Sequence, residues 1–176
     1  MKRIGALVDD IYEDLELWYP KIRLEEEGWV VTVAGPEKGR TFAGKHGYPC
    51  RSDVSYGDLA PEELDALLIP GGFAPDHMRR EPCVLSLVRA MQERGRLIAF
   101  ICHAGWVPIS AGILRGRRAT STIGIRDDMV NAGALWENAP TVVDGNLVSA
   151  RTPADLAPFA LAMVEWLRGA PDATQE

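Results

Sequence analysis

The sequence predicts an α/β protein with a mostly parallel central sheet, and two observations lead to this fold class. Apolar runs of four or five residues alternate with longer segments in which apolar residues recur at helical spacing. Such alternation is typical of parallel sheets covered by helices on both faces. The run at 97–101 leads directly into Cys102, His103 and a pair of small residues. This predicts a nucleophile elbow, a sharp strand-to-helix turn that carries a reactive side chain.

The first part of the chain supplies most of the expected parallel strands. Each is a short apolar run that ends at acidic residues, at Gly or Pro, or at the elbow, and they are 4–8, 30–34, 66–69 and 97–101. Helical spacing of apolar residues predicts one helix that Gly28 ends and another from Pro82 to Gly95. The Gly-rich segment 37–58 shows a weak pattern that suggests short strands at an edge.

The second part of the chain begins with the helix expected after the elbow, at 104–111. A short strand at 117–121 and a short helix at 127–133 follow. Asp144-Gly145 separates two β-rich runs and is a strong signal for a two-residue hairpin. Pro153 opens a last helix that Gly169 ends. We therefore expect one domain over 1–170 and a tail over 171–176.

Composition narrows the class of protein. A chain of 176 residues with 47% hydrophobic and 25% charged residues is ordinary for a soluble domain with a sizeable core. The net charge of −6 and the absence of a basic block argue against nucleic acid and anionic membrane as partners. The first apolar run meets two acids after five residues, which excludes a signal peptide or membrane span at this point.

The cysteines and histidines give no sign of a disulfide framework, a metal or a cofactor. The odd number of cysteines and their irregular spacing do not fit a set of structural disulfides or a zinc site. No two histidines stand at metal-binding spacing. A reducing cytoplasm is the simplest location for such a chain, whose cysteines and histidines are Cys50, Cys83, Cys102, His46, His77 and His103.

The residues that could take part in catalysis or ligand binding follow three of the predicted strands. Glu13 comes soon after the first strand, Gly71-Gly72 follows the third and Cys102-His103 follows the fourth. Ligands of parallel sheets bind beyond the carboxyl ends of the strands. We therefore expect these residues to meet in one site.

Cys102 is the candidate nucleophile of that site. A cysteine near a helix N-terminus has a thiolate favoured by unpaired N–H groups, so we expect its pKa to lie below that of a free thiol. The backbone N–H groups of Gly71 and His103 are candidate oxyanion donors, with Gly72 allowing close approach. The alternative is an inert, buried cysteine, because free cysteine is often buried.

The candidate acid and base also have plainer interpretations. Glu13 is either a carboxylate beside the thiol or a first-turn acid stabilised by the helix dipole. His103 is either a base or a helix-capping residue, and a Cys102-His103 hydrogen bond needs a special turn because adjacent side chains usually diverge. Asp76 and His77 follow Gly72 in an expected loop, where such polar residues are most often exposed to solvent.

Several separated segments resemble the PfpI-type intracellular proteases of the class I glutamine amidotransferase-like superfamily, to which the parkinsonism-associated protein deglycase also belongs. The similarity extends over nearly the whole chain. Its carriers are Tyr12-Glu13-Asp14-Leu15-Glu16-Leu17 with Tyr19-Pro20, Gly44-Lys45-His46-Gly47, Leu64 to Gly72, Ile101-Cys102-His103, and Gly124 to Gly133.

The resemblance implies a flavodoxin-like three-layer sandwich with Cys102 as nucleophile. It also implies a protonated Glu13 that is hydrogen-bonded to the sulfur, and assembly into homodimers that build hexamers. The acid that orients His103 would come from a neighbouring subunit, at the position of Asp76. This chain departs from the family pattern there, where Glu is usual, and at Ala104-Gly105-Trp106, where Gly-Pro usually follows the Cys-His pair.

Two classes of function follow. The first is an enzyme in which Cys102 attacks a carbonyl: a peptidase or amidase, or a glutathione-independent glyoxalase or deglycase acting on 2-oxoaldehydes. The second is a redox-responsive stress or chaperone-like protein in which Cys102 is oxidised. The same thiolate and oxyanion donors serve an amide and an aldehyde, so the residues alone do not select the substrate.

Overall fold

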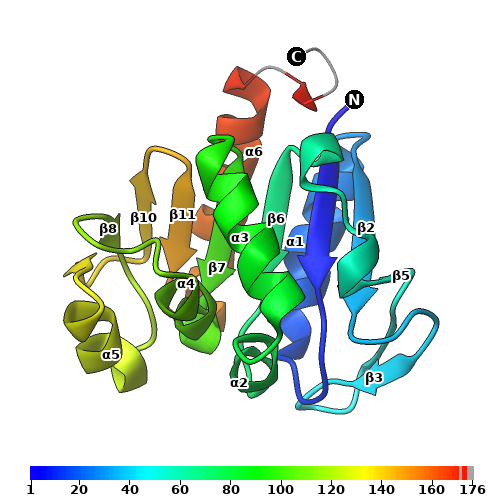
Figure 1. Ribbon diagram of the computed structural model, residues 1–176, viewed down its shortest axis with the longest axis horizontal. Coiled ribbons are helices and arrows are strands. Elements are labelled where there is room, and N and C mark those ends of the chain that lie inside the picture. The colour runs from blue at the N-terminus through cyan, green and yellow to red at the C-terminus, as the bar shows by residue number, and fades with distance from the viewer. Residues whose placement is uncertain (171, 174–176) are drawn as a thin grey trace.

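The computed structural model describes residues 1–170, 172 and 173, and a seven-stranded sheet forms its centre (Figure 1). The strand order is β10-β11-β7-β6-β1-β2-β5. Neighbours are parallel except β10 and β11, which form the predicted antiparallel hairpin. The strands are β1 (Arg3–Leu7), β2 (Val30–Gly35), β5 (Val54–Ser55), β6 (Ala66–Ile69), β7 (Leu97–Ile101), β10 (Thr141–Asp144) and β11 (Leu147–Ala150).

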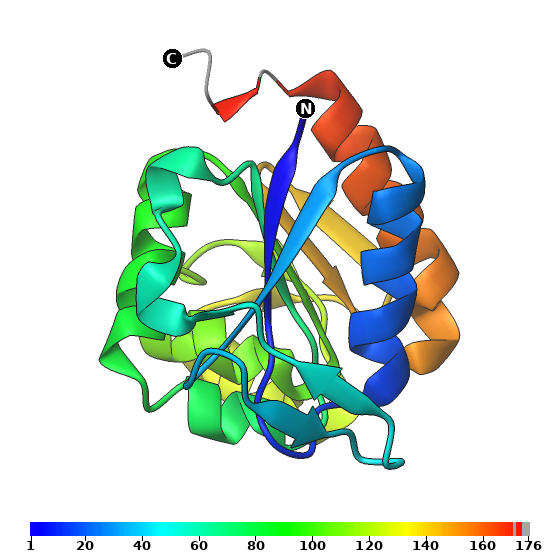
Figure 2. The ribbon, with the colours of Figure 1, turned by 90° about the vertical axis from the view of Figure 1, so that its right-hand side faces the viewer.

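Helices cover both faces of this sheet. Figure 2 shows α1 (Asp14–Glu26) and α6 (Leu156–Gly169) on one face and α3 (Pro82–Glu93) on the other. The short helices α2 (Ala74–Met78) and α4 (Trp106–Ala111) lie on the α3 side, where α4 packs against both α2 and α3. Strands β6 and β7 are buried along their whole length between the two layers. The expected sandwich with a mostly parallel sheet is confirmed.

The sequence explains where α3 begins and ends. Pro82 occupies the first turn, where a missing N–H costs nothing. Gly95, with φ 63°, follows the last turn and adopts the left-handed conformation that glycine tolerates best. Val84, Leu87 and Met91 recur at helical spacing and are buried against the sheet.

Smaller elements complete the described chain. An antiparallel hairpin, β3 (Thr41–Ala43) with β4 (Pro49–Arg51), and a parallel pair, β8 (Arg118–Ala119) with β9 (Leu135–Trp136), stand apart from the central sheet. Helix α5 (Arg126–Asn131) lies between β8 and β9 in the sequence. The 3₁₀ turns are η1 (Tyr56–Asp58), η2 (Pro61–Glu63), η3 (Cys102–Gly105), η4 (Ile123–Ile125) and η5 (Pro153–Asp155).

Two segments differ from the expectation or complete it. Asp76, expected in a loop, lies in the short helix α2. Within the weakly patterned segment 37–58, only β5 joins the central sheet, whereas β3 and β4 pair with each other.

Of the predicted tail 171–176, residues 171 and 174–176 lie outside the described residues. The Asp172 carboxylate accepts a hydrogen bond from the Met1 amino group and forms an ion pair with Lys2. None of the described helices combines the length and the apolar character needed to cross a bilayer.

Candidate active site

Cys102 occupies a strained turn at the carboxyl end of β7. Its φ is 63°, which is uncommon for any residue other than glycine and is often found at functional sites. The chain passes directly from the buried strand into η3 and then α4. The turn brings two adjacent side chains together, because Cys102 Sγ lies 3.3 Å from His103 Nδ1. This is the special turn that a Cys102-His103 contact requires.

Two backbone N–H groups, those of Gly72 and His103, lie near the sulfur of Cys102 and favour its charged form. Gly72 has φ 81°, and a Cβ there would lie 2.5 Å from the backbone nitrogen of Glu13 and from the carbonyl oxygen of Ile11. Only glycine fits this position without displacing the backbone. The Gly71 N–H, in contrast, donates to Glu16 Oε2 at 2.8 Å. In this structure the Gly71 N–H, expected as an oxyanion donor, is therefore occupied by Glu16.

The carboxyl group beside the thiol belongs to Glu16, and not to Glu13 as expected. Glu16 is completely buried beside Cys102, and the interaction between the two side chains contributes to the pKa of each. Gly71 lets both side chains approach, since a Cβ there would lie 2.4 Å from Glu16 Oε2 and 2.9 Å from Cys102 Cβ. Because Oε2 accepts from Gly71 and Oε1 meets no hydrogen-bond partner among the described residues, Oε1 is left to carry a carboxyl proton.

Glu13 lies one helical turn earlier, at the rim of the same pocket. Its carboxyl oxygens are 3.6 Å from Lys45 Nζ and 3.5 Å from His46 Nε2. Glu13 is the N-cap of α1 and has extended backbone dihedrals, and its buried side chain is directed to Lys45 and His46 rather than to the sulfur. The sequence held a signal for Glu16, which shares helical spacing with the buried residues Leu17, Pro20 and Leu24. An acid on an apolar helix face marks a buried carboxyl group.

Burial controls the titration of the Glu16-Cys102 pair. It raises the pKa of Glu16 to about 8, with the negative charge of Glu13 contributing in the same direction. Burial first and the charge of an ionised Glu16 second raise the pKa of Cys102 to about 12. The expectation of a lowered Cys102 pKa is therefore wrong. That expectation rested on the helix N-terminus alone, whereas burial and the nearby Glu16 carboxyl group have the larger effect on the pKa of Cys102.

The two pKa values belong to the pair, because the groups interact strongly. Near neutral pH Glu16 holds its proton, and the first proton lost by the pair leaves near pH 8. The N–H groups of Gly72 and His103 stabilise that negative charge on sulfur, whereas the Gly71 N–H stabilises it on the carboxylate. After this first proton is lost, the single negative charge has two possible positions. Either Glu16 is protonated beside a Cys102 thiolate, or Glu16 is ionised beside a Cys102 thiol.

His103 is a neutral imidazole at neutral pH. Burial, aided by the charge of Lys45, lowers its pKa from the ordinary value. None of the carboxylates in the described part of the chain reaches His103 within hydrogen-bond distance. Asp76, the expected orienting acid, instead pairs with Arg80 one turn along the chain. A single subunit thus brings Cys102, Glu16 and His103 together and leaves Asp76 apart.

The pocket at Cys102 measures about 500 Å³. Charged and imidazole side chains lie on one part of its wall and apolar side chains on the rest. Its lining residues are Glu13, Leu15, Glu16, Lys45, His46, Gly72, Phe73, Cys102, His103, Trp106 and Pro153. Its size is in the range of small-molecule sites, which measure about 300–1,000 Å³.

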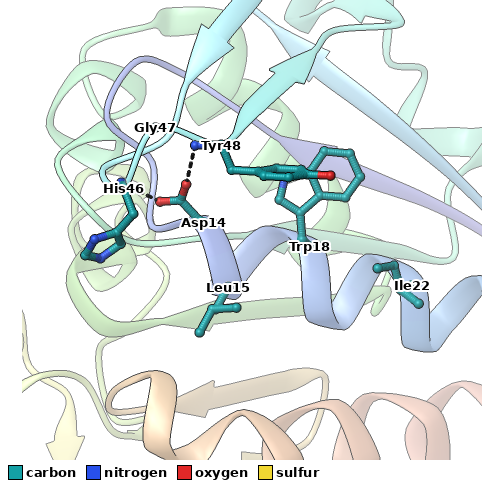
Figure 3. Close-up of a pocket in the computed structure, with 7 residues that line it drawn as sticks. All are labelled: Asp14, Leu15, Trp18, Ile22, His46, Gly47 and Tyr48. Atoms are coloured by element: carbon teal, nitrogen blue, oxygen red, sulfur yellow. Dashed lines mark hydrogen bonds between the residues drawn. The ribbon is translucent and has the colours of Figure 1, made fainter.

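A second, apolar groove of about 680 Å³ lies next to this pocket along α1 (Figure 3). Leu15, Ile22 and Tyr48 line it and are each about half exposed. The Trp18 and Tyr48 rings meet edge to face, with 5.3 Å between their centroids. Leu15 and His46 also line the Cys102 pocket, so the groove and the pocket adjoin each other.

Asp14 holds the β3–β4 loop over α1. Its two carboxyl oxygens accept the backbone N–H groups of His46 at 2.9 Å and Tyr48 at 2.8 Å, as Figure 3 shows. Glu13, Asp14 and His46 also bring possible metal-ligand atoms within 4.8 Å of one another. Both oxygens of Asp14 are already hydrogen-bonded, so this cluster is explained by loop closure.

A strained cysteine between a parallel strand and a helix, with amide donors and a buried acid on its sulfur, defines an α/β protein with a nucleophile elbow. The DJ-1/PfpI family model matches residues 2–166, and the chain belongs to that family. The resemblance drawn from the sequence is thereby confirmed.

Relatives and solved structures agree with this assignment. The chain is 48% identical over 166 residues to the protein named Deglycase PH1704 of Pyrococcus horikoshii, covering 94% of this chain and 99% of the relative. It is 39% identical to Putative cysteine protease YraA of Bacillus subtilis, covering 90% and 94%. The crystal structure of Drosophila melanogaster DJ-1beta matches with a TM-score of 0.90 and 28% identity, covering 99% and 94%. The relatives' names span the two enzyme classes that the resemblance implied.

Proposed function

We propose that this protein is a cysteine-nucleophile enzyme in which Cys102 adds to the carbonyl carbon of a small aldehyde, as in a glyoxalase or deglycase acting on 2-oxoaldehydes. The observation that carries the proposal is the buried Glu16 carboxyl beside Cys102, whose pKa of about 8 keeps a proton in the site at neutral pH. Addition to an aldehyde requires a nucleophile and one proton for the oxygen, and no leaving group.

The residues serve the addition step as follows. The sulfur of Cys102 forms a C–S bond, and the carbonyl π electrons move to the substrate oxygen. The N–H groups of Gly72 and His103 are near the sulfur and stabilise the developing negative charge. A proton from the Glu16-Cys102 pair or from His103 then neutralises the oxygen and gives a hemithioacetal. The Cys102 pocket of about 500 Å³ accommodates a small carbonyl compound.

Peptidase or amidase activity is the second candidate, and the 3.3 Å contact between Cys102 Sγ and His103 Nδ1 supports it. Amide hydrolysis needs a base for the thiol and an acid for the leaving amine, and a neutral histidine performs both in turn. The same thiolate is used in both reactions. The substrate therefore distinguishes them.

One experiment tests both candidates together. Purified protein is incubated with methylglyoxal and, separately, with a panel of fluorogenic peptides, and Cys102→Ala serves as the matched control. We expect methylglyoxal to be consumed by the wild type and not by the variant. Peptide cleavage that depends on Cys102, without methylglyoxal turnover, would assign the peptidase. Turnover of neither would favour a protein whose Cys102 responds to oxidants.

We further propose that the active form is a homo-oligomer in the cytoplasm, with a dimer as the basic unit that builds a hexamer. His103 has no acid from its own described chain, and Asp76 is exposed enough to reach a second copy once it leaves Arg80. The half-exposed Leu15, Ile22 and Tyr48 of the apolar groove support burial against another subunit. Sedimentation velocity checks this, and an active monomer would contradict it.

A further inference from the structure

A third hollow, the Trp106 cavity, lies next to the Cys102 pocket and is distinct from the apolar groove along α1. It measures about 560 Å³ and is lined chiefly by Arg79, Trp106, Ile109, Arg115, Asp128 and Asn131. Trp106 also lines the Cys102 pocket, so its indole is a wall common to both hollows. Trp106 belongs to the segment Ala104-Gly105-Trp106, in which the sequence departs from the Gly-Pro that usually follows the Cys-His pair in the family.

The Trp106 wall is held in place from three sides. Its Nε1 donates to Asp128 Oδ2 at 2.8 Å. The Arg79 guanidinium carbon lies 5.5 Å from the indole centroid, within the range of a cation–π contact. The His103 ring centroid lies 5.3 Å from the indole on the side of the active site. The Trp106 cavity therefore has a fixed aromatic wall.

Two arginines of this cavity lack a carboxylate partner. Arg79 donates from Nε to Ser110 Oγ at 2.9 Å, and the described residues place no acid within ion-pair distance of Arg79 or Arg115. Several arginines elsewhere are ion-paired, as Arg3, Arg40, Arg117, Arg118, Arg151 and Arg168 show. The whole chain carries a net charge of −6, and this cavity brings together two guanidinium groups that have no ion-pair partner among the described residues.

We propose that this cavity binds a phosphorylated small molecule, with the phosphate on Arg79 and Arg115. Guanidinium groups match phosphate oxygens through paired N–H donors, better than a lysine ammonium does. A volume of about 560 Å³ exceeds what one phosphate needs, and Trp106 with Ile109 offers apolar surface for the organic part. Asp128 directs Oδ2 to Trp106 and would repel an anion beside it, so the phosphate sits on the arginine side.

This proposal does not depend on the reaction at Cys102, and direct binding tests it. Isothermal titration calorimetry of the full chain compares phenyl phosphate with inorganic phosphate, phenol and benzoate. We expect saturable binding of phenyl phosphate, weaker binding of inorganic phosphate, and little binding of phenol or benzoate. No saturable binding of either phosphate would overturn the proposal.

Matched arginine variants locate the site. Arg115→Gln removes an exposed side chain that has no ion pair with any described residue, and Arg89→Gln removes an exposed arginine of α3 that does not line the cavity. A hydrogen-bonded charge pair corresponds to roughly a tenfold change in affinity or more. We expect that loss in Arg115→Gln and in Arg79→Lys, which keeps the charge and loses the paired donors, but not in Arg89→Gln. Equal affinities in Arg115→Gln and the wild type, or equal losses in Arg115→Gln and Arg89→Gln, would refute the assignment.

Discussion

Replacing Glu16 by Gln should make the protein progressively more stable than the wild type as the pH rises. Burial raises the pKa of Glu16 from 4.5 to about 8. Between these values the unfolded chain has released the proton while the folded chain retains it, so folding takes up a proton and stability falls with pH. Gln has no proton to lose, accepts the Gly71 N–H with its amide oxygen, and escapes this penalty.

The size of the effect follows from the shift. Each pH unit between 4.5 and 8 should cost the wild type up to ~1.4 kcal/mol relative to Glu16→Gln, and the whole interval roughly 5 kcal/mol. The effect is absent below the ordinary pKa, where both states are protonated, and complete above about pH 8. It should persist in a Cys102→Ala background, because burial is the main cause of the shift.

Urea unfolding at several pH values between 4.5 and 8 measures the difference between wild type and variant. The difference cancels the contributions of other titrating groups and any constant offset from the substitution. Glu62→Gln, at an exposed position in η2, is the matched control and should give a flat difference. A stability difference for Glu16→Gln that does not widen with pH would show that Glu16 is not a proton-retaining group.

Three further predictions concern the same site. Glu16→Gln should lower the pKa of Cys102 from about 12, because it removes the like charge, and thiolate absorbance at 240 nm measures the change. Gly72→Ala should lower the melting temperature and slow alkylation of Cys102 by iodoacetamide, because φ 81° and a 2.5 Å approach to backbone leave no room for a methyl group. Asp76→Ala should reduce turnover by tenfold or more while Cys102 alkylation stays nearly unchanged, if a partner subunit supplies this acid.

Each of these has a control and a contrary result. The absorbance titration is read as the difference from Cys102→Ala, and an identical profile in Glu16→Gln would separate Glu16 from the sulfur. Gly57→Ala has open space around its Cβ and should be near neutral. Equal effects of Gly57→Ala and Gly72→Ala would remove the steric argument. Asp127→Ala, an exposed acid, should leave turnover unchanged, and a fully active Asp76→Ala would remove the intersubunit acid.

Local patterns were sufficient to predict the fold and the position of Cys102 at the strand-to-helix turn. The continuous apolar run of β7 identifies a central strand, and the chain's first polar group after it is Cys102, so the elbow follows from sequence order alone. The donor amide was harder to predict. Whether Gly71 or Gly72 points its N–H at the sulfur depends on the φ of 81° at Gly72, which a Gly-Gly pair permits but does not specify.

The acid was misplaced for a related reason, because the position of a side chain around a helix depends on the residue at which the helix begins. Residues three apart lie on one face of a helix, about one turn from each other. With α1 beginning at Asp14, Glu13 precedes the first turn and lies near Lys45, whereas Glu16, within the helix, lies beside Cys102. The two acids then contribute differently to the site. The charge of Glu13 helps to raise the pKa of Glu16, and Glu16 retains its proton near neutral pH.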